Sequence, residues 1–126
     1  MGFLFDSFDG WKKYCDTKNI SLVQAVINYE IEQKGRTEEK IWEGLDQAWA
    51  VMKDAVHTGL NEDMTSRSGM INNGAKKVYN HKVTVLSKEF QNLISRALAA
   101  KEVNSCMGRI VAAPTAGASG IMPGVL

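Results

Sequence analysis

The sequence predicts a mainly α-helical protein, built as one multi-helix domain over residues 1–126. Three observations support this class. Apolar residues recur at three- and four-residue steps in several segments, residues that start and stop helices flank those segments, and strand signals are almost absent. Residues 83–86 form a short apolar run with strand character, but no partner strand is recognisable. The length allows one hydrophobic core and is too short for two domains.

Each predicted helix has an apolar side and end residues that favour starting or stopping there. Ser21 precedes the second segment as a residue suited to cap a helix N-terminus, and Gly35 follows it as one that tolerates the left-handed conformation. The third segment has the clearest periodicity, from Ile41 to Val56, and Gly59 is expected to end it. The predicted helices cover about residues 7–18, 21–34, 37–58 and 87–107.

Two stretches predict loops, at residues 61–75 and 113–120. The first is polar and rich in Ser, Asn and Gly. In the second, Pro114 prevents the preceding helix from continuing, and small residues follow it, so backbone N–H groups have little side-chain cover. Such a stretch before a helix can form a concave site for a carboxylate or phosphate. The alternative is that the small residues let two helices cross closely, and composition alone slightly favours it.

Composition and charge exclude several classes of protein. A net charge of +1 argues against a nucleic-acid-binding protein, which needs a concentrated basic surface. No segment approaches the ~20 apolar residues of a membrane helix, and the N-terminal residues lack the basic region of a signal peptide. We therefore expect a cytoplasmic protein, in which Cys15 and Cys106 are reduced core residues rather than metal ligands.

The C-terminal part of the chain carries the most specific pattern. It contains Glu102-Val103-Asn104, then Met107-Gly108, then Ala113-Pro114-Thr115-Ala116-Gly117, then Gly120 and Pro123-Gly124. This run resembles the signature of the iron–sulfur-dependent L-serine dehydratase alpha chain. An earlier loop of that family is similar to a second block, Met64-Thr65-Ser66-Arg67-Ser68-Gly69-Met70 followed by Ala75-Lys76-Lys77. The resemblance spans most of the chain, loosely in the first forty residues and closely after Asn104.

The resemblance implies an enzyme that converts L-serine to pyruvate and ammonia. In the implied mechanism, a [4Fe–4S] cluster acts as a Lewis acid on the substrate hydroxyl, while a base that the sequence does not identify removes the Cα proton. The two loops are expected to bind the substrate carboxylate. The residues predicted to bind substrate are Ser66, Ser68, Gly69, Asn104, Thr115, Ala116, Gly117 and Ser119.

The sequence departs from the family pattern in two ways. Asn72-Asn73-Gly74 stands where the family usually has Gly-Gly-Asp, so an acidic residue is missing, although Asn tolerates the left-handed conformation that such a turn needs. Two cysteines cannot supply three cluster thiolates, so we expect no metal centre on this chain alone. The apolar end predicts an incomplete part of a larger α-helical catalytic domain. The remainder of the alpha chain, or a beta chain, would complete it, in a homo- or hetero-oligomer.

Two other functions remain open at this point. One is a related cluster enzyme that acts on another β-substituted amino acid, such as a cysteine desulfidase, because the loops do not distinguish a hydroxyl from a thiol leaving group. The other is a non-catalytic helical interaction or regulatory module that shares the N-terminal part of the family.

Overall fold

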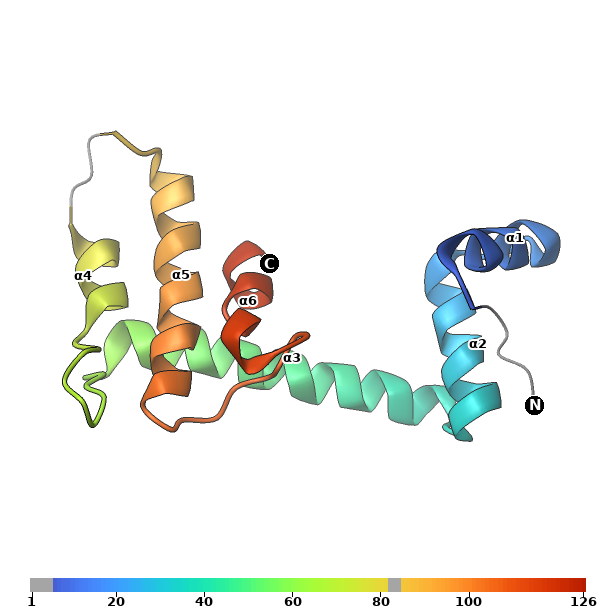
Figure 1. Ribbon diagram of the computed structural model, residues 1–126, viewed down its shortest axis with the longest axis horizontal. Helices are drawn as coiled ribbons and strands as arrows, with labels where there is room; N and C mark the ends of the chain where they lie inside the picture. The colour runs from blue at the N-terminus through green and yellow to red at the C-terminus, as the bar shows by residue number, and fades with distance from the viewer. Residues whose placement is uncertain (1–5, 82–84) are drawn as a thin grey trace. The chain divides into compact units, whose positions relative to one another are not determined.

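The computed structural model describes residues 6–81 and 85–126. Within these ranges the chain forms six α-helices, one short 3-10 helix and no strand, which confirms the mainly α class. In chain order the elements are α1 (Phe8–Lys18), α2 (Leu22–Lys34), α3 (Glu38–Asn61), α4 (Gly74–Asn80), α5 (Lys88–Ser105), η1 (Ala116–Ala118) and α6 (Ile121–Val125) (Figure 1). Over the same residues, no helix is long and apolar enough to cross a membrane.

The observed helix ends agree best with those predicted from the sequence where a nearby residue caps the helix. At the start of α2, the Gln24 N–H donates to Ser21 Oγ at 3.1 Å, and Gly35 after the same helix has φ +63°. The prediction that Gly59 ends the third helix is wrong, because α3 continues through it to Asn61. Gly59 is buried and faces α5, so it serves close packing rather than chain reversal.

The short helix α4 corrects the predicted loop 61–75, which ends at Asn73 instead. A helix of only seven residues has little stability of its own and depends on packing, here against α5. For this reason the local sequence pattern did not indicate it. Of the run at 83–86, residues 83 and 84 lie outside the described residues, and Val85 and Leu86 form a bend.

The chain divides into two compact units, with the boundary between Asp46 and Gln47 inside α3. In the first unit α1 packs against α2, and the buried residues include Cys15, Ala25 and Ile27. The core position predicted for Cys15 is thus confirmed, since its side chain is 7% exposed.

The second unit, residues 47–126, is organised around α5. Ala55, Met64, Ala100 and Val103 form its core cluster. Both α4 and α6 pack on α5, and Figure 1 shows them on either side of it. The site residues predicted from the sequence all belong to this unit.

Candidate functional site

The two predicted loops both meet the C-terminal end of α5. A pocket of about 450 Å³ is lined by Thr65 and Arg67 from the first loop and by Ser105, Cys106 and Met107 from the end of α5. The second loop is attached one residue earlier on the helix, where Asn104 Nδ2 donates to the Ala116 carbonyl at 3.3 Å. The structure therefore brings together two segments that are about forty residues apart in the sequence.

In the first loop, the three residues predicted to bind substrate hold the loop in its own shape. Ser66 pairs with Ile71 twice: the Ser66 N–H donates to the Ile71 carbonyl, and the Ile71 N–H donates to Ser66 Oγ, each at 3.1 Å. Ser68 Oγ lies 3.2 Å from Ser66 Oγ and accepts the Met70 N–H at 3.4 Å. Gly69 adopts φ +72° and donates to the Ser66 carbonyl at 2.9 Å.

The pocket wall is formed by the residues that alternate with these serines. Arg67 and Ser68 are the central residues of a turn, which the Gly69 N–H closes by donating to the Ser66 carbonyl. Thr65, which forms an isolated antiparallel bridge with Asn72, and Arg67 line the pocket, while Ser66 and Ser68 bond within the loop. Arg67 is the charged member of this lining and forms no ion pair with a carboxylate among the described residues. The pocket is therefore positively charged.

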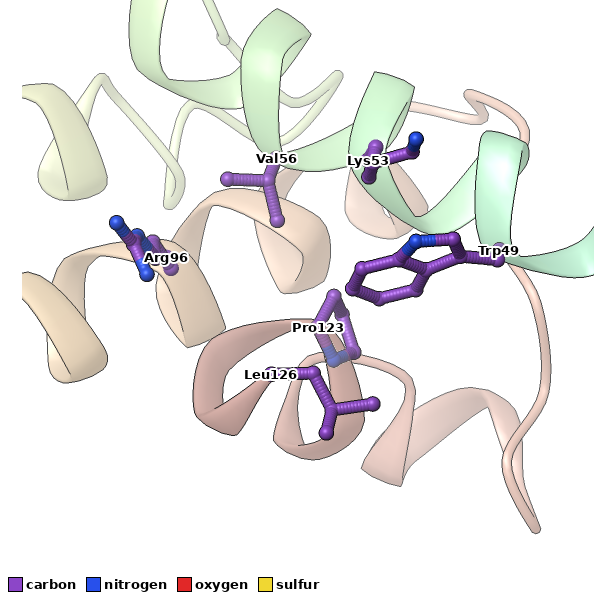
Figure 2. Close-up of a pocket in the computed structure, with 6 residues that line it drawn as sticks. All are labelled: Trp49, Lys53, Val56, Arg96, Pro123 and Leu126. Atoms are coloured by element: carbon purple, nitrogen blue, oxygen red, sulfur yellow. The ribbon is translucent and has the colours of Figure 1, made fainter.

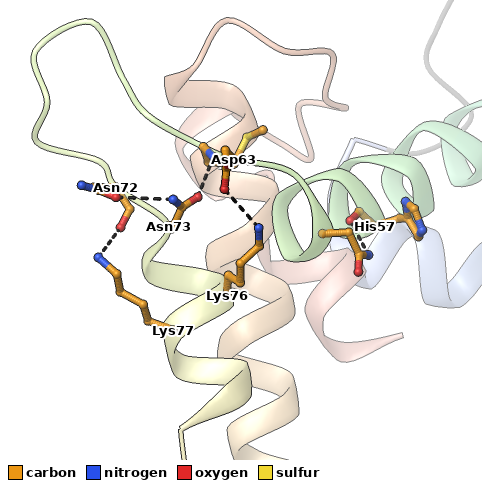
Figure 3. A network of polar contacts seen from close by, with 8 residues as sticks. His57, Asp63, Asn72, Asn73, Lys76 and Lys77 are labelled. Carbon is orange, nitrogen blue, oxygen red and sulfur yellow. Dashed lines mark hydrogen bonds and ion pairs between the residues drawn. The ribbon is translucent and has the colours of Figure 1, made fainter.

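A left-handed residue closes the first loop at the position where the sequence departs from the family pattern. Asn73 has φ +54°, its Oδ1 accepts the Met64 N–H at 2.7 Å, and its own N–H donates to the Met64 carbonyl at 2.9 Å. Lys77 Nζ donates to the carbonyl of Asn72 at 2.8 Å, as the network in Figure 3 shows. The predicted tolerance of Asn for this turn is confirmed.

Glu102 of α5 fixes the residues that follow the turn. Its side chain is 5% exposed, and Oε1 accepts the N–H of Gly74 at 2.8 Å and of Ala75 at 3.2 Å. These are first-turn N–H groups of α4, which have no partner inside the helix, and a carboxylate is the acceptor that the helix dipole favours. Glu102 Oε2 is also buried and has no hydrogen-bond partner among the described residues.

The second loop divides into an exposed part and a buried part. Thr115, Ala116 and Gly117 are exposed, and Thr115 Oγ1 caps η1 by accepting the Ala118 N–H at 3.3 Å. Ser119 is 2% exposed, its N–H donates to the Ala116 carbonyl, and its hydroxyl has no partner among the described residues. Of the four residues predicted here, three are accessible to a ligand and Ser119 is not.

The glycines after this loop support the close-packing interpretation of the small residues. A Cβ at Gly120 would overlap the backbone of Ala97 in α5, and one at Gly124 would lie 3.0 Å from the Ala97 side chain. Close helix packing is thus confirmed for Gly120 and Gly124. The interpretation as an anion-binding stretch applies only to the exposed residues before them.

A second pocket of about 240 Å³ combines apolar walls with two cations. Lys53 Nζ lies 5.7 Å from the centre of the Trp49 ring, which places the ammonium over the indole. Figure 2 shows the residues that line this pocket, which are Trp49, Lys53, Val56, Arg96, Pro123 and Leu126. None of the residues predicted to bind substrate contributes to it.

The donor groups of the described residues do not fit an iron–sulfur cluster. No group of three or more His, Cys, Asp or Glu lies close enough together in that part of the chain to hold a metal ion. Cys15 and Cys106 are free thiols in different compact units. A cluster bound by three thiolates would need sulfur from outside these residues.

Comparison with known proteins matches the chain to one family. The sequence model of the family described as "Serine dehydratase alpha chain" matches residues 17–126. The L-serine dehydratase alpha chain of Peptoniphilus asaccharolyticus is 35% identical over 115 residues, and the probable L-serine dehydratase alpha chain of Bacillus subtilis is 38% identical over 112. The L-serine dehydratase of Streptomyces coelicolor is 36% identical over 108 residues.

These alignments cover most of this chain and a minor part of each relative. They include 89%, 86% and 81% of the chain, but 39%, 37% and 23% of the respective relatives. The chain therefore spans less than half the length of the curated relatives that it matches. No solved structure matches it significantly.

Proposed function

Because the chain belongs to the serine dehydratase alpha-chain family, we propose that it forms part of an L-serine dehydratase, a lyase that converts L-serine to pyruvate and ammonia. The proposal rests mainly on one observation: the first and second predicted loops both contact the C-terminal end of α5, where the positively charged pocket lies. A zwitterionic amino acid carries a carboxylate that such a pocket attracts.

The proposed reaction is a β-elimination followed by hydrolysis. A base removes the Cα proton, the Cα–Cβ double bond forms, and the Cβ–O bond breaks to release water. The resulting 2-aminoacrylate tautomerises to an imine, which takes up water and releases ammonia to give pyruvate. Loss of the hydroxyl needs a Lewis acid or a proton donor, because hydroxide is a poor leaving group. The [4Fe–4S] cluster implied for this role does not fit the two thiols described above.

We assign substrate binding, rather than proton transfer, to this chain. The exposed segment from Thr115 to Gly117 presents backbone groups, and Asn104 holds that segment against α5. In the first loop, Ser66, Ser68 and Gly69 maintain the shape of the pocket wall. Glu102 is a carboxylate of α5 close in sequence to the pocket, but one of its oxygens already binds two backbone N–H groups.

Titration of the isotopically labelled chain with L-serine, monitored by amide NMR shifts, tests this assignment. We expect shifts in residues 65–69, 104–107 and 115–118, and weaker effects from D-serine. L-Cysteine in a parallel titration tests the alternative of a desulfidase, which predicts tighter binding of the thiol. A non-catalytic module predicts no response to either amino acid. Absence of any L-serine effect at these residues contradicts the proposal.

A further inference from the structure

We propose that Arg67 binds the substrate carboxylate, in the pocket that it forms with Thr65 and the end of α5. This inference rests on the proposed function and deepens it. From the sequence, the neighbouring hydroxyls and the small-residue loop were expected to bind the carboxylate. The structure favours the residue between the two serines.

The serine hydroxyls of the first loop already take part in hydrogen bonds within the loop. Ser66 Oγ accepts the Ile71 N–H, Ser68 Oγ accepts the Met70 N–H, and the two oxygens lie 3.2 Å apart. A carboxylate only accepts hydrogen bonds, and one of the two O–H groups already donates to the other oxygen, so at most one O–H is left for a ligand. The two hydroxyls therefore cannot both donate to a substrate carboxylate while the bond between Ser66 and Ser68 is kept.

Arg67 has the chemistry that carboxylate binding needs. A guanidinium presents parallel N–H groups that match the two oxygens of a carboxylate, and it is charged at every physiological pH. The described residues provide no carboxylate partner for Arg67, so a ligand would not have to displace one. The pocket volume of about 450 Å³ lies in the usual range of small-molecule sites, roughly 300–1,000 Å³.

The loop backbone around Arg67 is held in place by hydrogen bonds without a ligand. The bonds between Ser66 and Ile71 lie on one side, and Asn73 is attached to Met64 at the base of the loop. Met64 is itself part of the core cluster. A side chain carried on a fixed backbone loses less entropy on binding than one on a mobile loop.

The end of α5 offers a partner for the ammonium group of an amino acid. Ser105 Oγ donates to the Lys101 carbonyl at 3.1 Å, which leaves its oxygen lone pairs able to accept from a substrate ammonium. No acidic residue lines the pocket among the described residues. The pocket thus favours the carboxylate end of an amino acid over its ammonium end.

The test compares L-serine affinity in the wild-type chain and in Arg67→Met, Arg67→Lys and Arg96→Met, by NMR titration. We expect Arg67→Met to weaken binding by about tenfold to a hundredfold, the equivalent of one charge-assisted hydrogen bond. The L-serine affinity of Arg67→Lys should lie between those of the wild type and Arg67→Met, because lysine keeps the charge but cannot bind both carboxylate oxygens with parallel N–H groups. The control Arg96→Met removes an arginine that lines the other pocket and should bind L-serine as the wild type does.

Ligands that lack one group of serine identify which group Arg67 binds. Ethanolamine has no carboxylate, so its affinity should be equal in the wild type and in Arg67→Met, whereas 3-hydroxypropanoate should lose affinity as L-serine does. Amide spectra of each variant report whether it is folded. Equal L-serine affinity in Arg67→Met and the wild type overturns this inference and leaves the proposed function standing. No L-serine binding by the wild type overturns both.

Discussion

Glu102 Oε1 accepts the backbone N–H of Gly74 at 2.8 Å, across 28 positions of the sequence. This contact joins the beginning of α4 to α5 and ends the loop that carries Arg67. A Cβ at Gly74 would lie 2.7 Å from the same oxygen. The carboxylate can approach the helix N-terminus only because residue 74 has no side chain, so the two residues depend on each other.

Replacement of Glu102 should separate the effect of the acceptor from the effect of the charge. Glu102→Ala leaves two N–H groups without their acceptor and should lower the free energy of unfolding by about 2–4 kcal/mol. Glu102→Gln keeps one carbonyl oxygen for the same groups and should cost about 1 kcal/mol. Urea unfolding monitored by circular dichroism measures both. If Glu102→Ala were as stable as the wild type, these bonds would contribute little.

Gly74→Ala should destabilise the protein by about 1–3 kcal/mol, because the Glu102 carboxylate would have to move away from the new methyl group and lose its bonds to the two N–H groups. The double variant Gly74→Ala/Glu102→Ala keeps the new methyl group but removes the carboxylate that it overlaps. Its loss should therefore be clearly smaller than the sum of the two single losses, a coupling that a double-mutant cycle measures. Strict additivity would contradict the direct contact.

Gly59→Ala should cost about 1–3 kcal/mol, since a Cβ there would overlap the backbone of Ala99, which cannot easily move. Gly44, in the same helix, is the matched control because a Cβ there meets nothing within 4 Å. Gly44→Ala should stabilise the protein by about 0.5–1 kcal/mol through helix propensity alone. Thermal unfolding compares the two. A stabilising Gly59→Ala would exclude close packing of α3 on α5.

Ser87→Ala should shift the pKa of Glu89 upward. In the folded chain the pKa of Glu89 lies below its ordinary value, first because the carboxylate accepts its own backbone N–H and second because it accepts from the Ser87 hydroxyl. Loss of the hydroxyl should raise the pKa only part of the way to its ordinary value, because the bond to the backbone N–H remains. Carboxyl NMR titration measures it, and Glu39, whose pKa is lowered in the same way beside Thr37, should not change and is the internal control.

The lowered pKa of Glu89 also determines how the stability of the protein changes with pH. The folded state binds the proton less readily than the unfolded state, so the contribution of Glu89 to stability is present above the ordinary pKa. It is lost as the pH falls through the lowered pKa. Ser87→Ala also removes the acceptor of the Phe90 N–H, which should cost about 0.5–2 kcal/mol at neutral pH.

The sequence by itself determined the features that depend on near neighbours. The ends of α2 follow from Ser21 and Gly35, and the start of α5 from Ser87, because each cap bonds to groups within a few residues. The left-handed turn at Asn73 was likewise predictable from the tolerance of asparagine. The family resemblance was carried by residues at fixed short spacings and needed no structure.

Only the tertiary structure decided which side chains face the pocket and which are buried. Ser119 is buried, although the small and polar residues around it predicted an exposed loop. Arg67 lines the pocket, whereas Ser66 and Ser68 on either side of it bond to each other. The helix α4 depends on packing against α5, from which Glu102 also binds its first N–H groups. Composition and periodicity describe one segment at a time, whereas burial and hydrogen-bond partners depend on which distant segment packs against it.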